Sequence, residues 1–279
     1  MEPQLRIAVA SAMLAKGFPG SIYSCLKKRL KPGQSIVETG VFTEERVVDR
    51  TRLWKLLEGE PKPTALIGIC VRLDAGDTAP FRDVGAPVIL VDEEVEGAST
   101  VSCDNFAGGY LAGRHLAEIG RTSIAVVAGD LHRNGSYNAV QRVNGFAKAC
   151  AERGLRFSTR DVIEVSYYSH KDGVNVMTRL LEERRPIDAV FCAAGDATAA
   201  GMMAVARQKG IKIPEQLAVV GYDDSPMSAI ATPPLTSIRQ SAEEFAAEAY
   251  LLATERRAEC LARPQRIVFP PKLVIRQSA

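Results

Sequence analysis

Short apolar runs alternate with amphipathic segments along most of the chain. The runs at 6–10, 64–71, 87–91, 123–128, 162–168, 189–194 and 217–222 have the length and composition of buried strands. Between them, two sets of residues are spaced as on one face of a helix: Val143, Phe146, Ala147 and Cys150, and Ala199, Met202, Met203 and Ala206. Gly154 and Gly210 follow where a left-handed residue often ends a helix. The alternation predicts βαβ units, and therefore parallel sheets with right-handed crossovers.

The last of these strands ends at two adjacent carboxylates. Residues 217–220 form a continuous apolar run, Gly221 allows the backbone to bend, and Asp223 and Asp224 follow. Ligands of open parallel sheets bind outside the carboxyl ends of the strands, so Asp223 is expected to meet a polar small molecule. Neighbouring residues on an extended segment point in opposite directions. We therefore expect one carboxylate to face the ligand and the other to support the structure.

Length and charge indicate a two-lobed globular protein. A chain of 279 residues exceeds a typical domain, and its 46% hydrophobic content is ample for two cores. The 35 basic and 33 acidic residues are interspersed, so there is no concentrated basic surface of the kind that binds nucleic acid. Six cysteines without CxxC spacing are predicted to be reduced core residues. Without a spanning apolar segment or a secretory signal, the sequence predicts a cytoplasmic protein.

The sequence lacks the common enzyme motifs. The glycine-rich GGYLAG at 108–113 lacks the G-x-G-x-x-G order and lies inside a predicted helix. There is no Walker loop, no G-x-S-x-G elbow and no H-E-x-x-H pair. His115, His132 and His170 are too widely separated to predict a zinc site. We expect no catalytic residue, metal or cofactor, and an enzyme built around Asp223 is the weakest alternative.

Several ordered segments resemble LacI/GalR-type transcriptional regulators. They are DNFAGGYLAGRHLAEIGRTSIAVVAGD at 104–130, QRVNGFAKACAERG at 141–154, AVFCAAGDATAAGMMAVARQKGIKIPEQLAVVGYDD at 189–224, TPPLTSIRQ at 232–240 and the closing PPKLVIRQS. The first 85 residues match only in outline. The resemblance implies a two-lobed, periplasmic-binding-protein-like α/β fold in which each lobe is a parallel sheet flanked by helices. Residues 1–118 and 240–266 would form the N-terminal lobe, and residues 119–239 and 267–279 the C-terminal lobe.

The same resemblance implies a set of ligand-binding positions in the cleft between the lobes. Arg142 offers planar, multiple donors for ligand oxygens, and Tyr168 a flat wall for a sugar or purine ring. The implied set is Phe18, Asp104, Ser136, Asn138, Arg142, Tyr168, Asp223 and Gln240. Four of these residues also have a simpler structural interpretation. In that alternative, Arg142 would form a surface ion pair, Phe18 and Tyr168 would pack against neighbours, and Asp104 would cap the following helix.

Two departures from the family pattern affect the interpretation. Sugar-sensing relatives often carry Asn where this chain has Gly195, so a nucleobase or another small polar metabolite stays open beside a sugar. Asp196 is expected to cap the helix that starts at Ala197. The strand at 6–10 follows only five residues, which leaves no room for a helix-turn-helix headpiece.

The sequence therefore predicts the effector-sensing and dimerisation core of a LacI/GalR-type regulator. We expect a homodimer that reaches DNA only through a headpiece outside this chain and that has no membrane partner. The alternative is a stand-alone sugar-binding protein for transport or chemotaxis.

Overall fold

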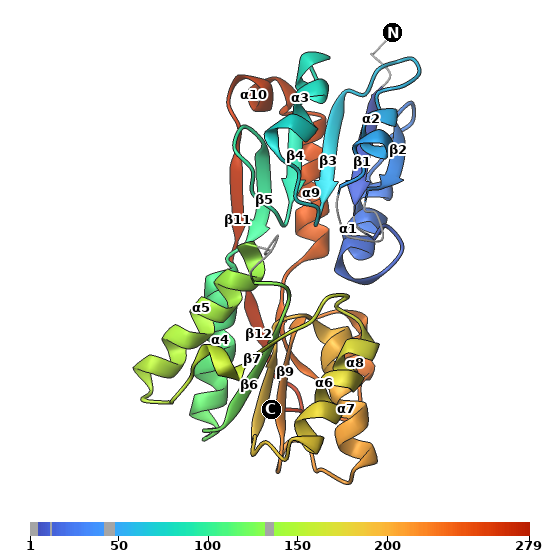
Figure 1. The fold of residues 1–279 in the computed structure, drawn as a ribbon. Helices are drawn as coiled ribbons and strands as arrows, with labels where there is room; N and C mark the ends of the chain where they lie inside the picture. The colour runs from blue at the N-terminus through green and yellow to red at the C-terminus, as the bar shows by residue number, and fades with distance from the viewer. Residues whose placement is uncertain (1–4, 12, 42–47, 132–136) are drawn as a thin grey trace. The chain divides into compact units, whose positions relative to one another are not determined.

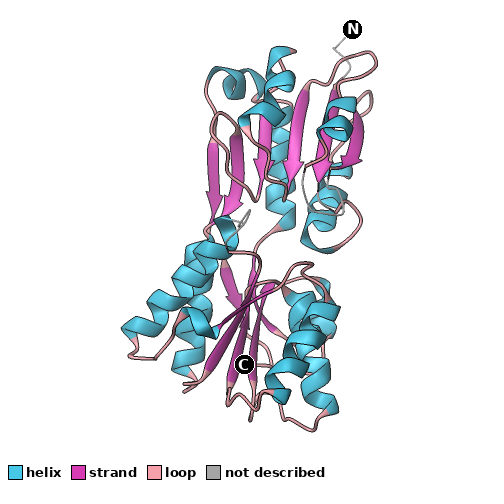
Figure 2. Cartoon of the chain, viewed as in Figure 1, coloured by secondary structure: helices cyan, strands magenta, loops and turns pink. Residues whose placement is uncertain are grey.

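The structure is a computed structural model, and it describes residues 5–11, 13–41, 48–131 and 137–279. The chain forms two compact units. Unit 1 comprises Met1–Ser102 and Ser241–Phe269, and unit 2 comprises Cys103–Gln240 and Pro270–Ala279. Each unit contains a mainly parallel sheet flanked by helices (Figures 1 and 2), which confirms the predicted fold class.

The first crossing between units comes earlier than the predicted boundary at residue 118. Helix α4 (Asn105–Glu118) belongs to unit 2, where it packs along α5 (Tyr137–Glu152). Two glycines bring these helices together. A Cβ atom on Gly109 would collide with the carbonyl oxygen of Arg142, and one on Gly145 with that of Phe106. The GGYLAG stretch therefore serves close helix packing, in agreement with its predicted place inside a helix.

Unit 1 has the strand order β11-β5-β4-β3-β1-β2. Leu53 of α2, Leu56 directly after it and Phe81 of α3 join a core cluster on one face of the sheet, while α1 packs against α9. The strands are β1 (Arg6–Ser11), β2 (Ser35–Gly40), β3 (Ala65–Ile69), β4 (Val88–Val91), β5 (Ser99–Cys103) and β11 (Arg266–Phe269). The helices are α1 (Gly17–Lys27), α2 (Arg50–Lys55), α3 (Ala75–Asp83), α9 (Ala242–Ala253) and α10 (Arg257–Ala262).

Unit 2 has the strand order β12-β10-β9-β8-β6-β7, parallel except for the β10–β12 pair. Its strands are β6 (Ile124–Ala128), β7 (Val162–Glu164), β8 (Ala189–Cys192), β9 (Ala218–Asp223), β10 (Thr236–Arg239) and β12 (Lys272–Val274). Its other helices are η1 (Thr159–Asp161), α6 (His170–Glu182), α7 (Asp196–Gln208) and α8 (Pro226–Ile230).

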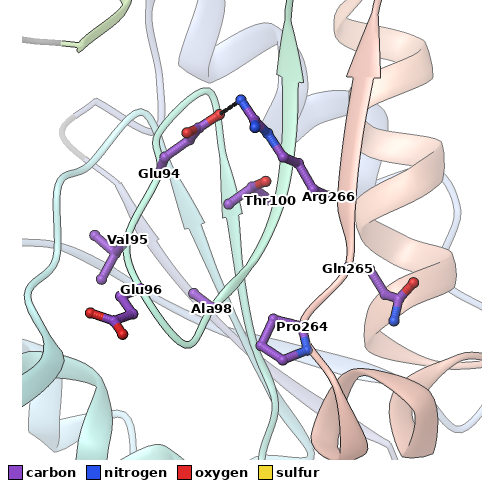
Figure 3. A pocket seen from close by; sticks show the side chains of 8 residues that line it. All are labelled: Glu94, Val95, Glu96, Ala98, Thr100, Pro264, Gln265 and Arg266. Atoms are coloured by element: carbon purple, nitrogen blue, oxygen red, sulfur yellow. Dashed lines mark hydrogen bonds and ion pairs between the residues drawn. The ribbon is translucent and has the colours of Figure 1, made fainter.

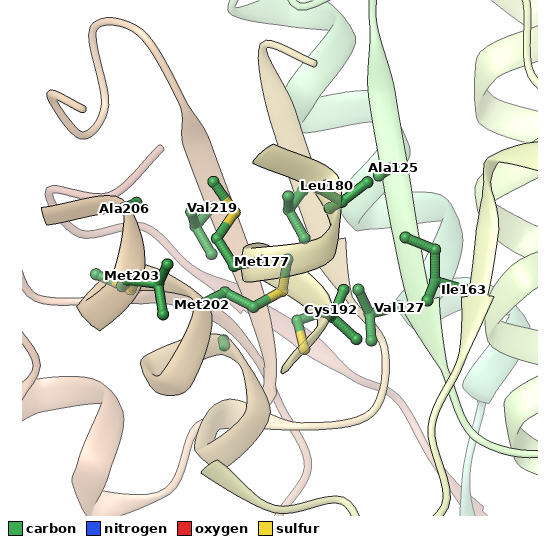
Figure 4. Close-up of a cluster of buried hydrophobic side chains, with 14 of the residues drawn as sticks. Ala125, Val127, Ile163, Met177, Leu180, Cys192, Met202, Met203, Ala206 and Val219 are labelled. Atoms are coloured by element: carbon green, nitrogen blue, oxygen red, sulfur yellow. The ribbon is translucent and has the colours of Figure 1, made fainter. Parts of the chain in front are cut away.

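Both faces of the unit 2 sheet are buried. Along β6, Ala125 and Val127 join a cluster with α6 and α7 (Figure 4), whereas Val126 and Ala128 join a second cluster with α4 and α5. Strands covered on both faces read as continuous apolar runs, which is why the sequence pattern located them. Among the described helices, none combines the length and apolar composition needed to cross a bilayer.

Most predicted elements are confirmed, with two kinds of exception. The helices expected around Phe146 and Met202 are α5 and α7, and Gly154 and Gly210 follow them with φ of 67° and 76°. The strand predicted at 162–168 was too long, because β7 ends at Glu164 and Ser169 caps α6. The sequence pattern also missed β2, β5 and β10, whose buried or edge positions include several Ser, Thr and Glu residues.

Candidate functional site

Asp223 and Gln240 meet at the carboxyl edge of the unit 2 sheet. Asp223 ends β9 with a φ of 97°, and Gln240 directly follows β10, the parallel neighbour in which Arg239 is paired with Asp223. Gln240 Nε2 donates a hydrogen bond of 2.7 Å to Asp223 Oδ1. Gln240 is only 4% exposed, and its Oε1 has no hydrogen-bond partner among the described residues. The edge therefore presents oxygen acceptors from two adjacent strands.

Asp224 is the structural member of the carboxylate pair. Its side chain accepts hydrogen bonds of 2.6 Å from Arg239 Nε and 2.9 Å from Ser228 Oγ, and Arg276 Nη2 lies 2.6 Å away. Partial burial disfavours its charged form, but these hydrogen bonds and ion pairs outweigh that effect and lower the pKa of Asp224. This division of roles agrees with the expectation that one of the two carboxylates supports the structure.

Asp196 does not cap its helix as predicted. Helix α7 begins at Asp196 itself, with Gly195 (φ 107°) as the N-cap. The carboxylate turns instead toward the neighbouring strands, accepting 2.6 Å hydrogen bonds from the Ser225 backbone N–H and the Ser237 hydroxyl. Burial, together with the charge of Asp223, raises the pKa of Asp196 to about 7.

The charge of Asp223 is only partly compensated. Burial raises its pKa, while the positive charge of Arg142 and the hydrogen bond from Gln240 act in the opposite direction. Its Oδ2 lies 3.0 Å from the place that a Cβ of Gly195 would occupy. Asp223 Oδ2 therefore packs closely against Gly195, where a side chain would be tightly crowded.

Arg142 lies inside a buried polar network behind this edge. Its Nε donates to Asn105 Oδ1 at 2.7 Å and its Nη1 to the Ala193 carbonyl oxygen at 2.9 Å. The guanidinium carbon sits 3.7 Å from the centroid of the Tyr222 ring, a cation–π contact. The side chain is 7% exposed, so the alternative of a surface ion pair is wrong.

Asn105 is the centre of this network, and sequence reasoning missed it. Its Oδ1 accepts from Arg142 and, at 3.2 Å, from the Tyr222 hydroxyl, while its Nδ2 donates at 3.0 Å to Asn138 Oδ1. The residue is 4% exposed at the start of α4. In the sequence, Asn105 is marked only by its place after the cap residue Asp104. An amide at such a place is too common to identify a functional residue.

The other predicted ligand-binding residues have the following places. Asn138 is buried and bonded to Asn105. Tyr168 is half-buried with a φ of 52°, and its hydroxyl occupies the space over Gly129 that a side chain there would need. Asp104 caps α4 by accepting from the Ala107 N–H at 2.8 Å.

Two predicted residues lie outside the described part of unit 2. Phe18 belongs to α1 of unit 1, where its ring packs edge-on against Phe245 at 5.7 Å between centroids. Ser136 lies outside the described residues.

Replacing Asn105 with alanine is expected to lower the free energy of unfolding by about 3 kcal/mol, since it leaves the buried Arg142, Tyr222 and Asn138 groups short of partners. Urea denaturation measures this change. Asn175→Ala, at an exposed position of α6, is the matched control and should change stability by less than about 0.5 kcal/mol. Equal effects of the two substitutions would contradict the central place of Asn105.

A separate open depression of about 400 Å³ lies in unit 1, between the β4–β5 connection and the start of β11 (Figure 3). Glu94 and Arg266 on its wall are joined by an ion pair of 2.9 Å. Of the predicted ligand-binding residues that the structure describes, none lines it. In the described part of the chain, no cluster of three or more His, Cys, Asp or Glu residues is arranged to hold a metal ion.

Known proteins share both the sequence and the fold. A family model described as a periplasmic binding protein-like domain matches residues 114–279. The HTH-type transcriptional repressor PurR of Histophilus somni (strain 129Pt) is 32% identical over 202 residues, which cover 72% of this chain and 59% of that protein. The HTH-type transcriptional regulator DegA of Bacillus subtilis (strain 168) is 32% identical over 194 residues, 69% of this chain and 56% of that protein.

A solved structure of the transcriptional regulator CelR in complex with cellobiose has a TM-score of 0.82 at 26% identity, covering 98% of this chain and 84% of that one. The similarity to this structure extends over both units. The curated relatives are longer, and this chain spans less than two thirds of their length.

Proposed function

We propose that this chain, which belongs to the periplasmic-binding-protein-like family and forms the effector-binding core of a LacI/GalR-type transcriptional regulator, binds a small polar metabolite at the Asp223 edge of unit 2. A sugar is the first candidate, and a nucleobase or a related metabolite the second. The relatives are named as transcriptional regulators and not as enzymes, which agrees with a purely binding role.

The observation that carries this proposal is the Asp223–Gln240 pair. Asp223 uses Oδ1 for Gln240, and its Oδ2 lies beside Gly195. Gln240 Oε1 is buried without a partner among the described residues. A buried acceptor without a donor costs about 1–3 kcal/mol, and a ligand that supplies the donor recovers this energy. Two acceptors side by side favour a ligand rich in O–H or N–H groups.

The position of the pair supports the same conclusion. It lies at the carboxyl ends of β9 and β10, where ligands of parallel α/β sheets bind. The cellobiose named for the CelR complex is rich in hydroxyl donors, which favours a sugar. Ligand contacts by the other predicted residues stay predictions. Arg142, Asn138 and Tyr168 make contacts within unit 2. The remaining residues are Asp104, Phe18 and Ser136.

The remaining parts of the proposal concern the whole protein. The relatives named HTH-type regulators carry sequence beyond the part matched here, so we propose that this core works with a helix-turn-helix element on DNA.

We further propose that it acts in the cytoplasm as a homodimer, because a two-fold dimer presents paired reading elements to a palindromic site. Light scattering should give about twice the chain mass.

A thermal-shift screen of the 279-residue chain against sugars, nucleobases and sugar phosphates tests the proposed function. A compound that binds only the folded protein stabilises it by about 2.7 kcal/mol when its concentration is about 100 times Kd. We expect at least one hydroxyl-rich or N–H-rich compound to raise the melting temperature by several degrees. If compounds without donors stabilised the chain equally well, the proposed recognition would be wrong.

A further inference from the structure

Building on the function proposed above, we propose that Asp196 is a positioning residue for Asp223 and that the two neighbouring carboxylates make effector affinity depend on pH. An uncharged effector would bind with uptake of a proton by this pair, so that affinity falls as the solution becomes alkaline. Asp196 is not itself an effector contact in this proposal, because its carboxylate already accepts hydrogen bonds from the Ser225 N–H and the Ser237 hydroxyl.

The geometry explains how Asp196 positions Asp223. The Asp196 carboxylate binds the Ser225 N–H on one side and the Ser237 hydroxyl on the other, both at 2.6 Å. Ser237 Oγ in turn accepts from the Asp224 N–H at 3.1 Å. The backbone directly after Asp223 is therefore held at Asp224 and Ser225, while Asp223 and Asp224 have positive φ of 97° and 50°, an uncommon conformation for residues other than glycine.

The charge of Asp223 acts on Asp196 and disfavours ionisation of its carboxylate. Asp223 Oδ2 comes within 3.0 Å of a Cβ position on Gly195, the residue directly before Asp196. Asp196 is 1% exposed, and in the described part of the chain neither carboxylate forms an ion pair. Two like charges that repel each other away from bulk water share a proton more readily than isolated ones, because ionising both is costly.

The charged and titratable groups around the pair do not remove this repulsion. Arg142 from α5 attracts Asp223, yet it is held by Asn105 and the Ala193 carbonyl oxygen. From β8, the buried Cys192 thiol faces both carboxylates, and burial together with their charges raises its pKa, so it stays neutral.

The remaining charged group beside the pair is balanced by partners of opposite charge. Asp224 is paired with Arg239 from β10 and with Arg276 beyond β12. Helix α6, which packs on α7, begins at the titratable residue His170. The backbone carbonyl of His170 lies against Gly201, more than one helical turn after Asp196. Asp196 and Asp223 are thus the titrating pair, and the pKa of Asp196, raised to about 7 by burial and by Asp223, places its titration in the physiological range.

The direction of the pH effect follows from water exclusion. A bound effector donates to Asp223, which keeps that carboxylate charged, and displaces water from the edge. Both changes make ionisation of Asp196 less favourable, so the pKa of Asp196 rises further in the complex. Below its pKa Asp196 is already neutral and binding involves no proton. Above it, binding takes up a proton, and affinity falls by at most about tenfold per pH unit.

The same titration changes stability without any ligand. A carboxyl group whose folded pKa lies above its value of 3.8 in the unfolded chain stabilises the fold at low pH, and this contribution is lost as pH rises toward about 7. In Asp196→Asn the neutral amide can accept from Ser225 and donate to Ser237, so this variant keeps the frame and loses the titration. Its melting temperature should therefore gain on that of the wild type as the pH rises from 5 to 8.5.

Two measurements on the full chain test the inference. The first follows the carboxyl carbon signals of Asp196 and Asp223 by NMR from pH 4 to 9 without ligand, and we expect a titration of Asp196 near neutrality. The second is calorimetric titration, at pH 6 and pH 8.5, of the strongest stabilising sugar or nucleobase from the thermal-shift screen. Wild type should lose at least threefold in affinity at pH 8.5, Asp196→Asn should lose less, and Glu182→Gln, which removes one exposed carboxylate of α6, should behave as wild type.

The outcomes separate this inference from the function on which it rests. Absence of any binding compound would overturn the proposed function, while the NMR and melting data would still decide whether Asp196 titrates near neutrality. Binding with equal affinity at both pH values, or an equal pH effect in Asp196→Asn, would overturn the inference and leave the proposed function intact. A titration of Asp196 below about pH 5 would overturn it as well.

Discussion

Substitution of Gly145 by valine is expected to unfold or severely weaken unit 2, with a loss of at least about 3 kcal/mol in the free energy of unfolding. A Cβ atom at this position would collide with the carbonyl oxygen of Phe106 and lie 2.9 Å from the Tyr110 backbone nitrogen. Backbone atoms cannot turn aside as a flexible side chain can, so α4 and α5 would have to separate.

Gly40→Val is the matched control for this substitution. Gly40 ends β2 in unit 1, and a Cβ atom there would meet nothing within 4 Å. Valine also suits a strand position. Urea denaturation of both variants should show a large loss for Gly145→Val and a change within about 1 kcal/mol for Gly40→Val. Comparable stability of the two variants would show that the helices are not packed as closely as described.

Substitution of Asp223 by asparagine is expected to weaken effector binding by more than about tenfold, because a charge-assisted hydrogen bond contributes roughly 1.5–3 kcal/mol. The fold should persist, since burial raises the pKa of Asp223 and the charge is therefore a cost to the folded state. Calorimetric titration with the compound found in the thermal-shift screen measures the affinity.

Glu182→Gln serves again as the control for removal of one negative charge from unit 2, and its affinity should equal that of the wild type. Unchanged affinity in Asp223→Asn would remove Asp223 from the effector site. A loss of affinity accompanied by an equal loss of melting temperature would instead point to a general disturbance of the fold.

The sequence pattern predicted the parallel strands and the helices that cover them, because buried strands and amphipathic helices depend on local spacing of apolar residues. It also placed Asp223 at a strand end and expected one carboxylate of the pair to be structural. Strands such as β5 and β10 escaped prediction because their polar residues are buried by neighbours far away in the chain.

The polar interior of unit 2 could not be predicted for the same reason. Asn105 interacts with Arg142 and Tyr222, and Asp196 with Ser225 and Ser237, over sequence separations that no local pattern encodes. An aspartate at the start of a helix is typical of a cap, and only the three-dimensional arrangement of β9 and β10 turns its carboxylate toward them.

A crystal structure of the chain with the strongest stabilising compound would test the central claim most directly, namely that unit 2 recognises a donor-rich metabolite through Asp223 and Gln240. The account predicts O–H or N–H groups of the compound at about 2.7–3.2 Å from Asp223 Oδ2 and Gln240 Oε1. A compound bound elsewhere, for example in the depression beside Glu94 and Arg266, with both acceptors left without a ligand donor, would contradict it.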